Sequence, residues 1–176
     1  MKEKLQEYAL IAEIISGIAI VISLVFVGIQ IQQGTEETAI NTSAIRTSAY
    51  QDLTGQMLDI YSGITTSPQL AELFYKAHCG QALSPVEEVQ MRTYGIQTIR
   101  HGDMAYQMYE QGLINQDQLG NANAILLANL TQTQYFHGIW NGLRVTANPA
   151  FVAYIDEMVE SVTPNGPTPS PWCSSR

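Results

Sequence analysis

The sequence predicts an all-α protein with a single transmembrane helix near its N-terminus. Three observations lead to this prediction: an apolar run at 14–31, helical hydrophobic periodicity downstream of it, and the lack of a convincing period-two strand pattern. We expect the helix to continue into an up-down bundle of about four to five helices, because short loops favour antiparallel neighbours. The expected organisation is a flank at 1–13, the span at 14–31, the bundle at 32–162 and a Pro-rich mobile tail at 163–176.

Composition limits the partners that such a protein can have. Only 14% of the 176 residues are charged, the formal net charge is −8 and the pI is about 4.7. Nucleic-acid binding needs clustered Lys and Arg, so the acidic balance argues against a nucleic-acid partner. It also argues against docking flat on anionic lipid.

The apolar run at 14–31 is long enough to cross a bilayer. At about 1.5 Å per residue it spans about 27 Å, and it lies between Glu13 and Gln30, which can reach the two interfaces. A cleaved signal peptide should have a basic, not acidic, beginning, and here Glu3, Glu7 and Glu13 precede the run. A buried helix of a soluble protein would need polar residues at helical spacing. We therefore favour a membrane anchor over both alternatives.

One face of this anchor helix is built from small residues. They recur at helical spacing: Ala9, Ala12, Ser16, Ala19 and Ser23. Small residues allow close helix–helix approach in membranes, which predicts a packing seam for self-association or for a partner span. The alternative, that such residues are simply common in transmembrane helices, stays open.

The flanking charges give a weak indication of orientation. Lys2 and Lys4 precede the span, whereas Glu36 and Glu37 follow it and no basic residue appears before Arg46. The positive-inside rule then places the N-terminus in the cytoplasm and the domain on the extracytoplasmic side of the inner (plasma) membrane.

Local signals predict five helical segments after the span. A first helix at 35–64 can join the anchor directly, with Gly34 as the weak point. Ser84-Pro85-Val86-Glu87 is a capping box with proline at the first helical position, a strong start signal. The expected helices are 35–64, 68–77, 84–111, 116–143 and 149–162. Their inward-facing residues are predicted to be Ile45, Ala49, Leu53, Met57, Ile60 and Ile64; Leu119, Ala122, Leu126, Leu130, Thr133, Phe136 and Trp140; and Phe151, Ile155, Met158 and Val162.

The polar cluster Arg100, His101, Asp103 and Tyr106 is the most unusual candidate site. Helical periodicity puts Asp103 in an apolar stripe, where a carboxylate needs a partner or a proton. The cluster is either a ligand or proton site inside the bundle or a structural cluster that fixes helix register. We favour the structural interpretation.

No catalytic residue, cofactor or metal site is expected. The chain has no Glu-x-x-His pair, no G-x-S-x-G, no P-loop and no GxGxxG. Cys79 and Cys173 lie too far apart for the common zinc patterns. They can form a disulfide if the domain lies outside the cytoplasm, but we favour two unpaired thiols, one half-buried and one in the tail.

The chain also resembles a family of uncharacterised bacterial single-span membrane proteins. The anchor segments EIISGIAIVISL at 13–24 and QIQQGT at 30–35 carry the resemblance, with looser matches in ALSP at 82–85, AYQMYEQGL at 105–113 and NPAF at 148–151. The resemblance implies an anchor and a helical domain and brings no activity. Family members often have arginine near the position of Gln32, which implies a cytoplasmic domain, opposite to the charge count of this chain.

The function that we expect is that of a non-enzymatic, membrane-anchored interaction protein. It would form homo-oligomers or act as an accessory or structural subunit of a larger membrane complex. The alternative is a membrane-tethered sensor or small-ligand-binding bundle with its polar site near Arg100, His101 and Asp103.

Overall fold

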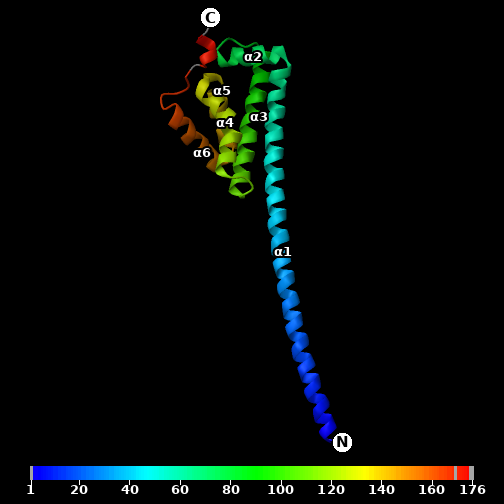
Figure 1. Ribbon diagram of the computed structural model, residues 1–176. Coiled ribbons are helices and arrows are strands. Elements are labelled where there is room, and N and C mark those ends of the chain that lie inside the picture. Colours follow the sequence, from blue (N-terminus) through cyan, green and yellow to red (C-terminus); the bar gives the residue numbers. More distant parts are fainter. Residues whose placement is uncertain (1, 169, 175–176) are drawn as a thin grey trace. The chain divides into compact units, whose positions relative to one another are not determined.

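The computed structural model describes residues 2–168 and 170–174, and within them it is all-helical (Figure 1). It contains six α-helices and two short 3-10 helices, is 87% helical and has no strand in the described part. The α-helices are α1 (Lys2–Thr66), α2 (Pro68–His78), α3 (Pro85–Glu110), α4 (Gln116–Gln132), α5 (Gln134–Leu143) and α6 (Pro149–Val162). The 3-10 helices are η1 (Arg144–Thr146) and η2 (Pro171–Ser174). The predicted fold class, one apolar N-terminal helix followed by a helical bundle, is confirmed.

The chain divides into two units, Met1–Ile45 and Arg46–Arg176. The first unit is a segment of α1 alone, and Gly34 does not interrupt the helix. Within α1 lies an 18-residue window of mean hydropathy 2.7, none of it buried, which is long and apolar enough to cross a membrane. The second unit holds the last part of α1 and all the other helices. Its boundary at Arg46 lies further along α1 than the expected start of the bundle at Gln32.

Local capping explains where the helices of the second unit begin and end. Ser67, Ser84, Asn115, Thr133 and Asn148 each accept a backbone hydrogen bond at a helix start. At Ser84 and Asn115 the reciprocal bond of a capping box is also present. Past the ends of α2 and α3, Gly80 and Gly112 have φ values of +64° and +69°, which a side chain would disfavour.

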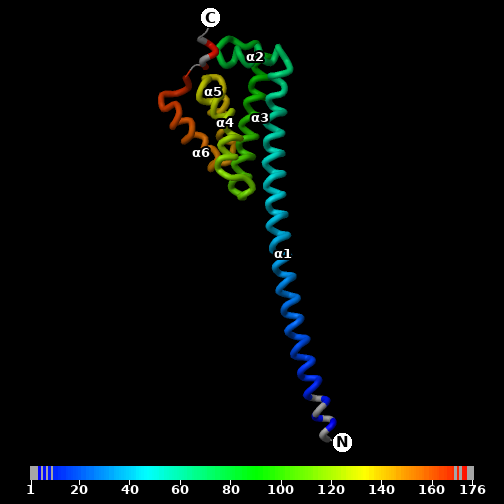
Figure 2. Tube along the Cα trace, viewed as in Figure 1, coloured from blue at the N-terminus to red at the C-terminus, as the bar shows by residue number. Residues whose placement is uncertain are grey.

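The bundle core lies between antiparallel helices. On α1 and α3, Leu53 lies opposite His101 and Tyr61 lies opposite Tyr94, so the two helices run in opposite directions. Figure 2 shows α3 and α4 side by side, joined by a tight turn. The largest fully buried side chains include Trp140, Phe151, Leu53, Met91, Leu119, Leu130 and Ile155. Burying such side chains from water is the main stabilising contribution in a domain of this size.

Gly102 marks the closest approach of α3 and α4. A Cβ built at this glycine would lie 2.3 Å from the Oδ1 atom of Asn123 and 3.1 Å from atoms of Leu126 and Phe151. Asn123 has no exposed surface, and its Nδ2 donates to the carbonyl of Leu119. The helices can therefore pack at this distance only because residue 102 lacks a side chain.

The structure corrects the expected single helix at 116–143. Thr133 is extended, with φ −143° and ψ 135°, and separates α4 from α5. Its hydroxyl caps α5 by accepting from the N–H of Phe136 at 3.0 Å. The predicted inward stripe of this region is nevertheless confirmed, since all seven of its residues are buried. Two other predicted core residues are wrong: Ile45 and Val162 are 51% and 62% exposed.

A disulfide joins Cys79, at the end of α2, to Cys173 in η2, and this corrects the expectation of two unpaired thiols. The segment before Cys173 also contacts the bundle. Thr168 donates its N–H to the carbonyl of Thr131 at 2.9 Å, and Ser170 is buried. The C-terminal segment that we expected to be a mobile tail thus has fixed contacts in its described residues, because the disulfide and these bonds hold it on the domain.

Candidate functional site

The four residues of the predicted polar cluster on α3 do not all line one cavity: Arg100 and His101 line a groove that Asp103 and Tyr106 do not reach. His101 is buried and donates from Nε2 to the carbonyl of Leu53 on α1 at 2.9 Å. Asp103, also buried, accepts from Gln107 at 3.4 Å and lies 3.8 Å from the guanidinium of Arg100. The side chains of His101 and Asp103 thus both have polar partners within the protein, as the buried residues of a structural cluster must.

The other two members of the cluster face different neighbours. The guanidinium of Arg100, 53% exposed at the side chain, also donates to the hydroxyl of Thr146 at 3.4 Å. The ring of Tyr106 packs against Phe151 and Tyr154, with centroids 5.9 and 5.5 Å away. Loss of hydration and the nearby carboxylate of Glu110 raise the pKa of Tyr106. The cluster thus links α3 to α1, η1 and α6.

A second polar group lies deep in the aromatic core, around His78 at the end of α2. Its Nδ1 lies 2.9 Å from the carbonyl of Phe74, and its Nε2 lies 3.2 Å from the side-chain amide of Asn129. Burial lowers the pKa of His78, which favours the neutral ring. A neutral His78 ring whose Nδ1 donates to the Phe74 carbonyl has an Nε2 that can only accept. We therefore assign the amide nitrogen of Asn129, which donates, to the contact with Nε2. The amide oxygen would then be available to the buried hydroxyl of Tyr94.

Aromatic rings and the disulfide enclose this buried histidine. Phe74, Phe136 and Trp172 have ring centroids 3.8, 5.3 and 5.8 Å from that of His78. Cys79 follows His78 directly, and its bond to Cys173 places Trp172 against the same cluster. We interpret the His78 group as part of the packing of this end of the domain, because its polar atoms find partners within it.

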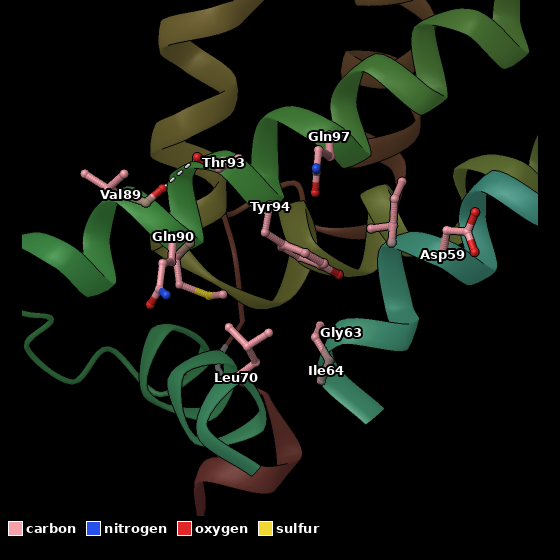
Figure 3. Close-up of a pocket in the computed structure, with 11 residues that line it drawn as sticks. Asp59, Gly63, Ile64, Leu70, Val89, Gln90, Thr93, Tyr94 and Gln97 are labelled. Atoms are coloured by element: carbon pink, nitrogen blue, oxygen red, sulfur yellow. Dashed lines mark hydrogen bonds between the residues drawn. The ribbon is translucent and has the colours of Figure 1, made fainter. Parts of the chain in front are cut away.

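A groove in the second unit is formed by α1, α2 and α3 (Figure 3). Its volume is about 510 Å³, within the range of small-molecule sites. The lining residues are Asp59, Ile60, Gly63, Ile64, Leu70, Val89, Gln90, Met91, Thr93, Tyr94 and Gln97. In Figure 3 the Tyr94 ring reaches from α3 across the groove, between Gln97 on one side and Leu70 on the other.

A second groove of about 380 Å³ adjoins the first. The two share Asp59, Ile60 and Gln97, and the second adds Gln56, Arg100, His101 and Met104. The lining of both grooves is mainly apolar, and Asp59 and Gln97 lie in the part that the two grooves share. Sequence reasoning missed the two grooves, because three separate helices build them.

Among the described residues, no three His, Cys, Asp or Glu side chains lie close enough together to hold a metal ion.

The small-residue face of the anchor carries Ala12, Ser16, Ala19 and Ser23 on exposed positions of α1, and the hydroxyl of Ser23 donates to the carbonyl of Ala19 at 2.9 Å. The side chain of Ala9 lies outside the described residues.

The chain matches no protein-family model, no curated protein and no solved structure. The resemblance of its anchor to bacterial single-span proteins stays a prediction.

Proposed function

We propose that this protein is a single-pass membrane protein that works as an interaction module, assembling through its anchor helix with its own copies or with other membrane subunits. The observation that carries the proposal is the apolar window of α1, no residue of which is buried by the rest of the chain. Such a surface needs lipid or another apolar span around it. The small side chains of Ser16, Ala19 and Ser23 offer a face for a second span.

The domain belongs, in this proposal, on the extracytoplasmic side of the inner membrane. The disulfide between Cys79 and Cys173 supports this side, because cytoplasmic thiols are kept reduced. The charge count agrees, since Lys2 and Lys4 precede the span and no basic residue follows it before Arg46. The disulfide and the flanking charges therefore both favour an extracytoplasmic domain, whereas the family resemblance implies a cytoplasmic one.

Assembly can be tested by native mass spectrometry of the full chain in nanodiscs. We expect a multimer or a co-purifying subunit from the wild type, and its loss in Ala19→Leu, because leucine would separate the two small-residue faces. Gly17→Leu is the matched control, because it places a leucine on another face of the helix, about 100° or more around the axis from Ser16, Ala19 and Ser23. In the described chain nothing lies within 4 Å of a Cβ at Gly17. A wild type that stays a monomer without partners would overturn the proposal.

The side of the membrane can be tested separately in intact cells. Two single-cysteine variants in a Cys79→Ser, Cys173→Ser background, Gln6→Cys and Ser161→Cys, place a thiol on exposed positions on either side of the span. A membrane-impermeant maleimide should label Ser161→Cys and leave Gln6→Cys unlabelled. The reverse pattern would place the domain in the cytoplasm.

A further inference from the structure

The groove between α1, α2 and α3 is apolar over most of its lining, which includes the side chains of Ile64, Leu70 and Met91, with the amide of Gln90 beside them. Its polar end, which also lines the adjoining groove, is formed by the carboxylate of Asp59 and the amide of Gln97. A mostly apolar depression that carries a single carboxylate fits a molecule that is itself amphipathic.

Charge at the polar end favours a cation. Asp59 is exposed and has no ion pair among the described residues. Arg100 lines the adjoining groove, and its guanidinium contacts Asp103 and Thr146 instead. The ring of Tyr94 forms part of the wall, and an aromatic face attracts an ammonium group. The net charge of −8 would further attract cations toward the domain.

We propose that this groove binds a small single-tailed amphiphile with a cationic amine head. The tail would lie against Ile64, Leu70 and Met91, and the ammonium would lie at Asp59, with the Gln97 amide oxygen as an additional acceptor. The groove volume of about 510 Å³ suits a molecule of this size. This ligand-binding activity goes beyond assembly through the anchor and does not depend on it.

Three matched probes with an eight-carbon tail separate the contributions of tail and head: octylammonium, octanol and octanoate. The full chain is placed in nanodiscs, and binding is followed by the methyl resonance of Met91 in ¹³C-methyl-methionine protein. Met91 lies in the groove lining, so partition of a probe into lipid does not move its resonance; Met158 on α6 serves as an internal reference. We expect octylammonium to bind about three- to fivefold more tightly than octanol, and octanoate to bind most weakly.

Two variants test the head-group contact. Asp59→Asn should remove the preference for octylammonium over octanol and leave octanol binding unchanged. Asp52→Asn is the matched control, because Asp52 is an exposed carboxylate on α1 that is not part of either groove lining, and it should leave all three affinities unchanged. A Met91 resonance that does not move with octylammonium, or equal affinity for the three probes in the wild type, would overturn the proposal.

The tail contact needs its own test. Leu70→Ala should weaken octylammonium and octanol by the same factor, because it shortens only the apolar wall. The melting temperature of each variant establishes that the domain is folded, so that a loss of binding with an unchanged melting temperature reports on the groove itself. A Leu70→Ala protein that is folded and binds both probes as the wild type does would contradict the assigned position of the tail.

Discussion

The two faces of α3 differ in how closely they are packed. Toward α4, the Oδ1 atom of Asn123 lies only 2.3 Å from where a Cβ of Gly102 would be. Toward α1, a groove of about 510 Å³ remains open, and a Cβ on Gly63 of α1 would meet only a Leu70 methyl at 3.5 Å. One helix thus provides a rigid scaffold on one face and an accessible surface on the other.

The closed interior of the domain and its open groove also differ in the exposure of their polar groups. In the closely packed interior, His78 contacts both the Phe74 carbonyl and the Asn129 amide, away from water. Along the groove, Asp59 and Gln97 remain exposed. A buried polar group with partners inside the protein is not accessible to a ligand, whereas an exposed polar group is. The comparison therefore predicts that substitutions on the closed face lower the free energy of unfolding strongly, and that substitutions on the open face change it little.

The largest effect is expected from Gly102→Ala. The new methyl would overlap the Oδ1 atom of Asn123 and lie in tight contact with Leu126 and Phe151. Because Asn123 is fully buried, we expect a loss of about 3 kcal/mol in the free energy of unfolding. Gly63→Ala is the matched change on the open face and should gain up to about 1 kcal/mol from helix propensity. Denaturant unfolding followed by the fluorescence of the buried Trp140 measures both; equal effects would contradict the comparison.

His78 should make stability depend on pH. Burial lowers its pKa in the folded state, so below the ordinary value of 6.5 the unfolded chain takes up a proton that the folded one does not. Stability should therefore fall as pH decreases from 7 to 5, by at most about 1.4 kcal/mol per pH unit. His78→Gln should remove this slope, and His137→Gln on α5 should retain it. Identical slopes in the wild type and His78→Gln would show that another group is responsible.

Much of the fold could be predicted because its signals are local. Ser84-Pro85-Val86-Glu87 specifies a helix start through hydrogen bonds among neighbouring residues, and the structure contains both bonds of the box. The inward stripe from Leu119 to Trp140 follows from helical periodicity, and it is buried. The break at Thr133 escaped prediction because this threonine fits the stripe and is also a good N-cap; only tertiary packing decides between the two roles.

The candidate sites could be predicted only in part. The sequence placed Asp103 in an apolar stripe and His101 within one turn of it, and both residues are buried. It could not identify the partner of His101, the carbonyl of Leu53, because every residue carries such a carbonyl. The pairing of Cys79 with Cys173 and the groove likewise depend on segments distant in sequence, for which one chain carries no local signal.

A smaller effect is expected from Asp103→Asn. The amide preserves the volume and can still accept from Gln107, while the lost attraction to Arg100 is weak because that guanidinium is half exposed. We expect a loss of no more than about 1 kcal/mol and unchanged octylammonium binding at Met91. A loss of binding with an unchanged melting temperature would instead make the polar cluster part of the ligand site.

The smallest effect is expected at Glu87, which joins α3 to α2 on the surface. Bonds from the Ser84 backbone and hydroxyl and from the Lys76 ammonium, 3.0 Å away, lower the pKa of Glu87 from 4.5 to about 2. Its contribution to stability should therefore be complete above pH 4.5 and disappear as pH falls toward 2.

Glu87→Gln separates the charge of this residue from its role as a cap. Glutamine can complete the capping box but cannot pair with Lys76, so the melting temperature at pH 6 should fall by only a few °C. The difference from the wild type should shrink as pH falls from 4.5 to 2, while Glu88→Gln, next along the exposed face, should show no such convergence. A difference that persists undiminished at pH 2 would mean that the cap itself was damaged, because at that pH about half of the wild-type carboxyl groups are protonated and most of the contribution of the charge is lost.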